Sequence, residues 1–137
     1  PTTTAKGGWS RRVKHQHQGL RLVTASYTLP TSGAVDAAPT TLVANSATEG
    51  YVLDSRIITD AAGGCTVATD PEYTGVGTNQ GGTLSANFQP VASCTGVAPA
   101  TSNGDTIKLI ERATIAGGTP AGSDYTDVIT VVAAGNF

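Results

Sequence analysis

The sequence predicts an all-β protein, with a single immunoglobulin-like antiparallel β-sandwich of about seven strands. Three observations support this fold class. Gly, Ala, Ser and Thr make up about half of the chain, and charged residues only 13%, roughly half the usual share. Short segments of alternating apolar and polar residues recur between clusters of Gly, Pro and Asn. No apolar run is long enough for a transmembrane helix, and no helical period is sustained.

The first predicted strand covers residues 19–29, where Val23, Ala25, Tyr27 and Leu29 alternate with Thr and Ser. A period of two is typical of a half-buried strand. Residues 1–18 show no such period, and we expect them to form an N-terminal arm. A single β-domain then spans residues 19–137.

Turn residues separate the later predicted strands. Pro90 lies within one of them and predicts an edge strand or a bulge there. The stretch from Pro120 to Tyr125 leads directly into the last strand, and two interpretations are open. Tyr125 either forms a corner, with its hydroxyl bonded to the backbone upstream, or is an ordinary buried Tyr. The predicted strands are 41–45, 51–59, 65–69, 83–94, 106–115 and 125–134.

The chain has two cysteines, Cys65 and Cys94, and each lies in a predicted strand. No C-x-x-C motif and no Cys/His cluster with zinc spacing occurs. An even pair in a Thr-rich chain with few Lys predicts one disulfide and an oxidising compartment. Two buried free thiols are the alternative.

The N-terminal part is basic and the rest is acidic. Residues 1–35 hold no acid, and all 10 Asp and Glu lie in residues 36–137. Three interpretations of the arm are open: binding to nucleic acid or phosphate, docking on the acidic body of a neighbouring copy, or a solvated tail. Its aromatic residue would stack on a base or pack against a neighbouring subunit. The residues of this basic arm are Lys6, Trp9, Arg11, Arg12, Lys14 and Arg21.

No motif in the sequence predicts a reaction. His15 and His17 are the two histidines, and two ligands do not make a closed metal site. Both lie in the aperiodic arm, a poor place for a preorganised base. A loop calcium near Asp70 and Glu72 is a minor alternative. We therefore predict no enzyme activity, no cofactor and no bound metal.

The two ends of the chain carry a family resemblance. The C-terminal stretch has a Gly, a Tyr, an alternating Thr/Val strand and a terminal aromatic, and residues 22–30 read LVTASYTLP. These features resemble the fimbrial subunits of chaperone–usher systems, in particular the colonisation-factor (alternate) or archaic pilins. The matching C-terminal residues are Gly122, Tyr125, Val128, Thr130, Val132 and Phe137.

The resemblance implies a sandwich that lacks one strand, which the N-terminal segment of the next subunit fills. The donor strand would be residues 19–29, with Val23, Ala25, Tyr27 and Leu29 as the side chains that plug the groove. On this basis we expect a structural subunit of an extracellular, cell-surface filament (a pilus). Its partners would be copies of itself and an assembly chaperone, with no membrane contact.

The first residue favours a second class of function. Pro1 is a poor residue to follow a signal-peptidase cut, but a good one to follow removal of an initiator Met, and the chain contains no Met. These features favour a virion coat or decoration protein, whose basic arm contacts neighbouring subunits or packaged nucleic acid. A carbohydrate-binding module is less well supported, because the aromatic residues are scattered.

Overall fold

Short strands and one turn of 3-10 helix form the regular structure of this chain. A computed structural model describes residues 8–17, 19–44, 47–61, 65–75, 77, 79–96 and 104–135. The all-β fold class predicted from the sequence is confirmed. Within the described ranges, no helix is long and apolar enough to cross a membrane. The elements are β1 (Gly8–His15), β2 (Gly19–Leu22), β3 (Tyr27–Pro30), β4 (Thr40–Thr41), β5 (Gly50–Thr59), β6 (Cys65–Thr69), the 3-10 helix η1 (Pro71–Tyr73), β7 (Gln80–Gly81), β8 (Gln89–Gly96), β9 (Thr106–Thr114), β10 (Tyr125–Thr126) and β11 (Ile129–Gly135).

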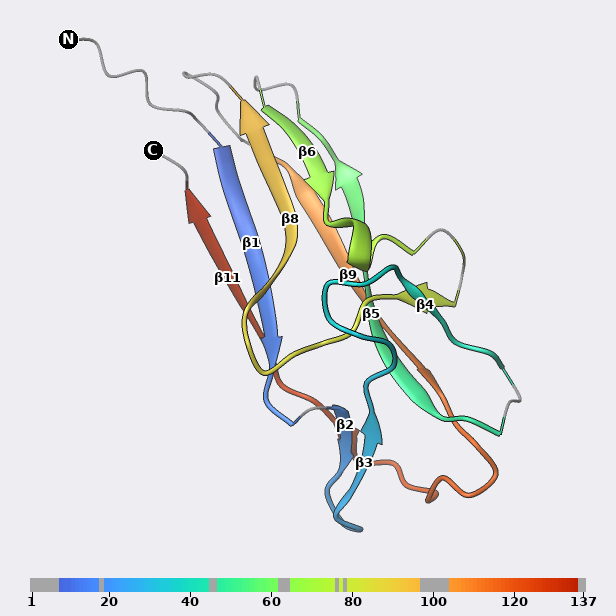
Figure 1. Cartoon of the computed structure of the whole chain (residues 1–137). Coiled ribbons are helices and arrows are strands. Elements are labelled where there is room, and N and C mark those ends of the chain that lie inside the picture. The colour runs from blue at the N-terminus through green and yellow to red at the C-terminus, as the bar shows by residue number, and fades with distance from the viewer. Residues whose placement is uncertain are drawn as a thin grey trace, which may run out of the picture.

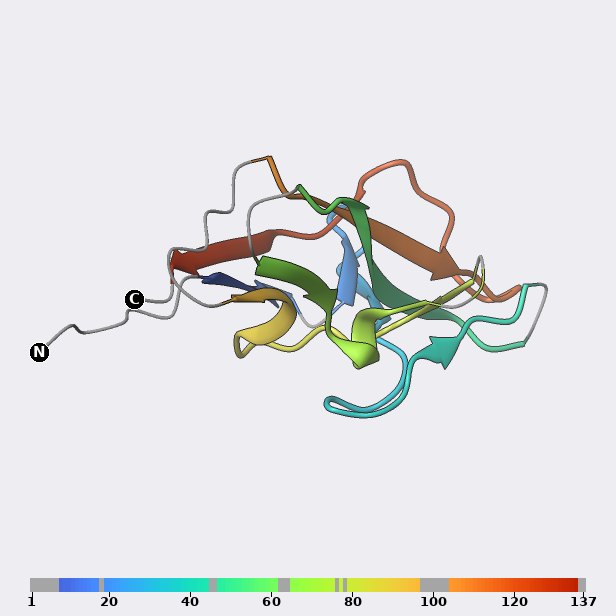
Figure 2. The same ribbon diagram turned by 90° about the horizontal axis from the view of Figure 1, so that it is seen from above.

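The strands form two layers, which Figures 1 and 2 show from two directions. One layer is a four-stranded sheet in the order β11-β1-β8-β6, and the other contains the long pair β5-β9. Two smaller sheets, β10-β2-β3 and β4-β7, complete the fold. All ladders are antiparallel. The immunoglobulin-like connectivity of this sandwich stays a prediction.

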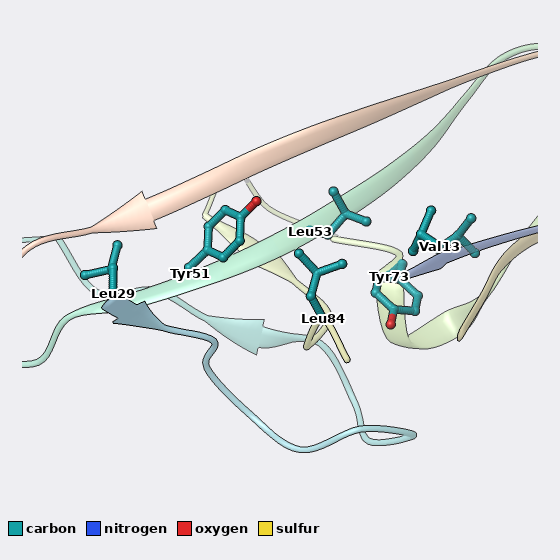
Figure 3. Close-up of a cluster of buried hydrophobic side chains, with 7 residues drawn as sticks. Val13, Leu29, Tyr51, Leu53, Tyr73 and Leu84 are labelled. Carbon is teal, nitrogen blue, oxygen red and sulfur yellow. The ribbon is translucent and has the colours of Figure 1, made fainter. Parts of the chain in front are cut away.

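The main core lies between the two layers and receives side chains from nearly every sheet. Tyr51 and Leu53 extend from β5 into this cluster, Val13 comes from β1, and Leu29 comes from β3 (Figure 3). The Tyr51 hydroxyl points towards β9 in this view. Burial of such side chains is the dominant favourable term in folding. The buried members of this cluster are Val13, Leu29, Tyr51, Leu53, Tyr73, Leu84 and Val91.

The strand β5 is buried on both faces, and a glycine-rich segment pairs with its edge opposite β9. Val52 and Asp54, whose side chains alternate with those of Tyr51 and Leu53, are fully buried. Gly82 pairs with Leu53 through two backbone hydrogen bonds of 3.0 and 2.7 Å. A Cβ added at Gly81 would lie 2.6 Å from the Leu53 carbonyl oxygen, so this close approach requires glycine.

Several predicted boundaries agree with the structure and others do not. The strand at residues 65–69 is confirmed, but 83–94 is a strand only from Gln89 onward. The predicted last strand is divided into β10 and β11. The corner interpretation of Tyr125 agrees with a hydrogen bond of 2.7 Å from its hydroxyl to the Pro120 carbonyl oxygen. Pro90 lies at a register shift, where the β1-β8 ladder skips Val91.

Candidate assembly site

The described part of the predicted basic arm is largely a strand, and this corrects the boundary at residue 18. Residues 8–15 form β1, which lies inside the four-stranded sheet between β11 and β8. These residues are therefore part of the β-domain rather than of a separate extension. Lys6 and the rest of residues 1–7 lie outside the described residues.

The residue pattern of β1 explains why it pairs on both sides. Trp9, Val13 and His15 are buried and share one face with Arg11, because side chains alternate along a strand. Ser10, Arg12 and Lys14 occupy the opposite face. This alternation is hidden in the sequence because Arg11 and His15 are polar residues at inward-facing positions.

Two antiparallel ladders hold β1 in place. With β11 it forms a regular ladder from Trp9↔Gly135 to His15↔Ile129. With β8 it pairs from Gly8↔Thr95 to Val13↔Gln89, with a register shift between Arg11 and Arg12. Among the described residues, β11 pairs with no strand other than β1. The C-terminal strand therefore depends on β1 for its place in the sheet.

Trp9 anchors the first half of β1 to the opposite layer. Its indole Nε1 donates a hydrogen bond of 2.9 Å to Asp105 Oδ2, just before β9. The Arg11 guanidinium lies 4.7 Å from the centre of the Trp9 ring, a distance typical of a cation–π contact. Trp9 is thus an anchor within its own chain. Its ring packs in a second core cluster with Cys65, Val67, Ala92 and Cys94.

His15 and Asp127 join the end of β1 to the segment before β11. The His15 Nδ1 atom lies 3.5 Å from Asp127 Oδ2, and the two side chains are 1% and 0% exposed. Neither atom has a hydrogen-bond partner within the described residues. Burial lowers the pKa of His15, although the charge of Asp127 opposes this effect. The imidazole is therefore held mainly neutral at neutral pH.

The remaining basic residues lie on the outer face of the sheet or elsewhere. Arg12 is exposed, and the Lys14 ammonium lies 4.9 Å from the centre of the Phe88 ring. Arg21 is exposed on β2, in a different sheet. The structure therefore groups the basic residues of β1 but separates Arg21 from them.

The prediction that residues 19–29 form a single donor strand is wrong. Residues 19–22 and 27–30 form a hairpin that pairs within the chain, from Gly19↔Pro30 to Leu22↔Tyr27. Residues 23–26 form its turn, where Ser26 has a φ of 51°. Its four expected plug residues therefore do not share a face. Val23 and Ala25 are exposed in the turn, Tyr27 is half-buried, and only Leu29 is buried in the core.

The predicted disulfide is confirmed. Cys65 of β6 is bonded to Cys94 of β8, with a Cα–Cα distance of 5.6 Å. The bond joins neighbouring strands of the four-stranded sheet and lies beneath Trp9 in the second core cluster.

Several carboxylates of the described residues have structural partners. Asp70 accepts a hydrogen bond from the Glu72 backbone at the start of η1. Buried Glu72 accepts from the backbone N–H groups of Asp36 and Thr83, and burial raises its pKa. Asp54 accepts from Arg112 at 2.8 Å and Arg56 at 2.9 Å. In the described ranges, one group of potential metal ligands occurs, Cys65, Cys94 and Asp105, but the two sulfurs are bonded to each other.

Comparisons of this chain with protein-family models, with curated proteins and with solved structures give no match.

Proposed function

We propose that this chain is a structural subunit that assembles with copies of itself into an extracellular filament by strand exchange, and that the exchanged strand is β1. The observation that carries the proposal is the place of β1, a terminal strand of the described chain inserted between two other strands of the same sheet. A strand in this position can be supplied by its own chain or by a neighbouring copy with the same ladders.

The side chains of β1 suit a strand that fills a groove. Val13 is fully buried, and Trp9 is 8% exposed. Without β1, the groove between β8 and β11 would expose the main core at one end and the disulfide cluster at the other. Because that exposure is costly, a subunit whose own β1 is withdrawn gains stability by accepting the β1 of a neighbour.

Exchange of β1 can build an open-ended assembly. Each copy has one β1 to give and one β8-β11 groove to fill, so two copies can exchange strands reciprocally or pass β1 on head-to-tail, and the proposal is the head-to-tail form. A head-to-tail contact that does not close produces a filament. The disulfide adds support for a compartment outside the cytoplasm, because such bonds persist mainly in oxidising environments.

A cross-strand disulfide tests the exchange. Ser10 and Ala134 are directly opposite each other in the β1-β11 ladder, and directly opposed residues are close enough to be bridged. The double variant Ser10→Cys, Ala134→Cys, oxidised as a monomer, fixes β1 in its own chain and should form no filaments by electron microscopy. The same variant oxidised after assembly should give a ladder of covalently linked multimers on a non-reducing gel.

The controls are the two single cysteine variants, which can link subunits only in pairs. Filaments of the oxidised monomer with the wild-type length distribution would contradict the proposal. A gel with only internally bridged subunits after oxidation of assembled filaments would also contradict it.

A second candidate function, a virion coat or decoration protein, is favoured by the outer face of the sheet. Arg12 and Lys14 lie on this face of β1, and no described Asp or Glu lies on the outer face of β1, β6, β8 or β11. Exposed cations of this kind attract phosphate. Electron microscopy of assembled particles before and after nuclease treatment distinguishes the two candidates. Closed shells or nuclease-protected nucleic acid would support the coat function, and thin fibres unaffected by nuclease would support the filament.

A further inference from the structure

The disulfide lies beside a carboxylate from the other layer of the sandwich. Cys65 belongs to β6 and Cys94 to β8, both in the four-stranded sheet, whereas Asp105 immediately precedes β9. The two sulfurs and one carboxylate oxygen of Asp105 all lie within 4.8 Å of one another. Within the described ranges, no other three side chains of His, Cys, Asp or Glu converge in this way. Strand pairing assembles this group, so the sequence spacing contains no metal-binding motif.

Two hydrogen bonds from outside the group hold the Asp105 carboxylate in place. The Trp9 indole Nε1 donates to Asp105 Oδ2 at 2.9 Å, and the backbone N–H of Ala61 donates to Oδ1 at 2.9 Å. In metal sites, carboxylate ligands are commonly oriented by hydrogen bonds of this kind. The surroundings of Asp105 therefore suit a carboxylate that also binds a cation.

The three side chains have the ligand chemistry of a zinc site. Thiolates and carboxylates both bind Zn²⁺, at about 2.3 Å for sulfur and about 2.0–2.2 Å for oxygen. In a tetrahedral site these bond lengths place neighbouring ligand atoms about 3.5–3.8 Å apart. Atoms that already lie within 4.8 Å of one another reach this spacing through small side-chain rotations once the S–S bond is open. Water would take the fourth position, because Asp105 is half-buried and borders solvent.

We propose that the reduced form of this chain binds one Zn²⁺ through the thiolates of Cys65 and Cys94 and the carboxylate of Asp105. A dithiol reductant gives two electrons and two protons to the S–S bond and itself becomes a disulfide. Binding of Zn²⁺ then releases the two thiol protons to solvent. A small-molecule disulfide reverses the sequence: it takes two electrons from the thiolate pair, the S–S bond forms again, and Zn²⁺ leaves.

The zinc ion would connect parts of the fold that the disulfide does not connect. The S–S bond joins two neighbouring strands of one sheet. Zinc would also hold the segment before β9, which belongs to the other layer. The zinc-bound state would form in a reducing compartment and the disulfide in an oxidising one. No ligand lies in β1, so this proposal does not depend on strand exchange.

Cobalt and zinc titrations of the full-length chain test the proposal. The protein is reduced with excess dithiol, which is then removed by gel filtration without oxygen. One equivalent of Co²⁺ should produce a thiolate-to-cobalt charge-transfer band and the intense visible bands of a tetrahedral cobalt site. Zn²⁺ should abolish these bands by displacement. The oxidised protein should produce none of them, because its two sulfurs are bonded to each other.

The variant Asp105→Asn separates this site from simple binding by two thiols. It keeps both cysteines and removes the carboxylate, so the dissociation constant for Zn²⁺ should rise at least about tenfold. The matched control is Asp60→Asn, which removes an exposed carboxylate next to Ala61. Because Asp60 is not part of the group, this variant should bind Zn²⁺ like the wild type.

Fluorescence of Trp9, the only tryptophan of the chain, reports the fold of the reduced protein. Zinc should shift its emission towards that of the oxidised protein, even if the reduced chain is unfolded without metal, because metal binding is then coupled to folding. Reduced protein without the cobalt bands, or Asp105→Asn with wild-type affinity, would overturn the proposal. Equal affinity for Zn²⁺ in the presence and absence of denaturing urea would also overturn it. Filament formation does not enter any of these measurements.

Discussion

His15 Nδ1 lies 3.5 Å from Asp127 Oδ2, with both side chains removed from solvent. The pair connects the end of β1 to the start of β11, the two strands that the proposed strand exchange involves. Because burial lowers the pKa of His15 below its ordinary value of 6.5, the unfolded chain binds a proton at this residue more readily than the folded one.

Acidification should therefore destabilise the protein through His15. The free energy of unfolding contributed by this group is lost as the pH falls through 6.5 towards the lower folded pKa. We expect urea unfolding to show a decrease in stability between about pH 7.5 and 5.5, and His15→Gln to show a smaller decrease. The measurement is the difference in the free energy of unfolding between wild type and His15→Gln across this pH range.

The other histidine provides the control. His17→Gln should retain most of the wild-type pH dependence, because His17 is not part of the buried pair and its charge is the smallest of the effects on the pKa of His15. Glu72 changes the free energy of unfolding in the opposite direction to His15. Because its pKa is raised in the folded state, the folded state binds a proton there more readily and gains stability as the pH falls. If the stabilities of His15→Gln and wild type change in parallel with pH, His15 is not the titrating group.

The sequence predicts the all-β class and the disulfide well because both depend on simple features. Composition disfavours a helix bundle, no apolar run is long enough for a transmembrane helix, and two cysteines allow one internal pairing. The strand at residues 65–69 agrees at both ends, because Val67 alternates with Thr and turn glycines precede it.

The candidate site is harder to predict, because two strands have misleading patterns. In β1 the Arg11 guanidinium lies over the Trp9 ring and the buried His15 faces a carboxylate, so inward positions contain polar residues. In residues 19–29 the apparent alternation continues through the turn at 23–26, where only the positive φ of Ser26 marks a hairpin. The structure of both segments is determined by pairing with strands distant in the sequence, which periodicity alone does not reveal.

Truncation of Val13 should weaken the attachment of β1. Val13 is 0% exposed in the main core, and full burial of a Val side chain is worth about 1.5–3 kcal/mol. Val13→Ala should lower the free energy of unfolding by a similar or slightly smaller amount, measured by chemical denaturation. Val43→Ala, at a residue 60% exposed, should change it little. Equal stability of the two variants would contradict the placement of β1 in the core.

Removal of the disulfide should lower the free energy of unfolding by more than Val13→Ala or Val43→Ala does. In the chain-entropy model, a bridge between residues 29 positions apart contributes about 3–4 kcal/mol. The double variant Cys65→Ala, Cys94→Ala should lose at least this free energy, because both sulfurs are also buried beside Trp9. Trp fluorescence then reports whether the second core cluster opens before the rest of the molecule. A loss below about 1 kcal/mol would mean that the bridge adds little to stability.

Gly19 provides a test of the β2-β3 hairpin, which takes the place of the expected donor strand. A Cβ at this position would lie 2.1 Å from the Leu29 carbonyl oxygen, and Gly19 has a φ of +151°. Since the colliding atom belongs to the backbone of the paired strand, it cannot move without breaking the ladder. We expect Gly19→Ala to lower the free energy of unfolding by at least about 1–3 kcal/mol.

Gly117 supplies the matched control for this substitution. No atom lies within 4 Å of a Cβ built there, so Gly117→Ala should be neutral or should stabilise the protein by about 0.4–1 kcal/mol through the unfolded state. The two variants differ only in where one methyl group is added. If Gly19→Ala were as stable as Gly117→Ala, residues 19–30 would not have this hairpin register, and the extended donor strand would again have to be considered.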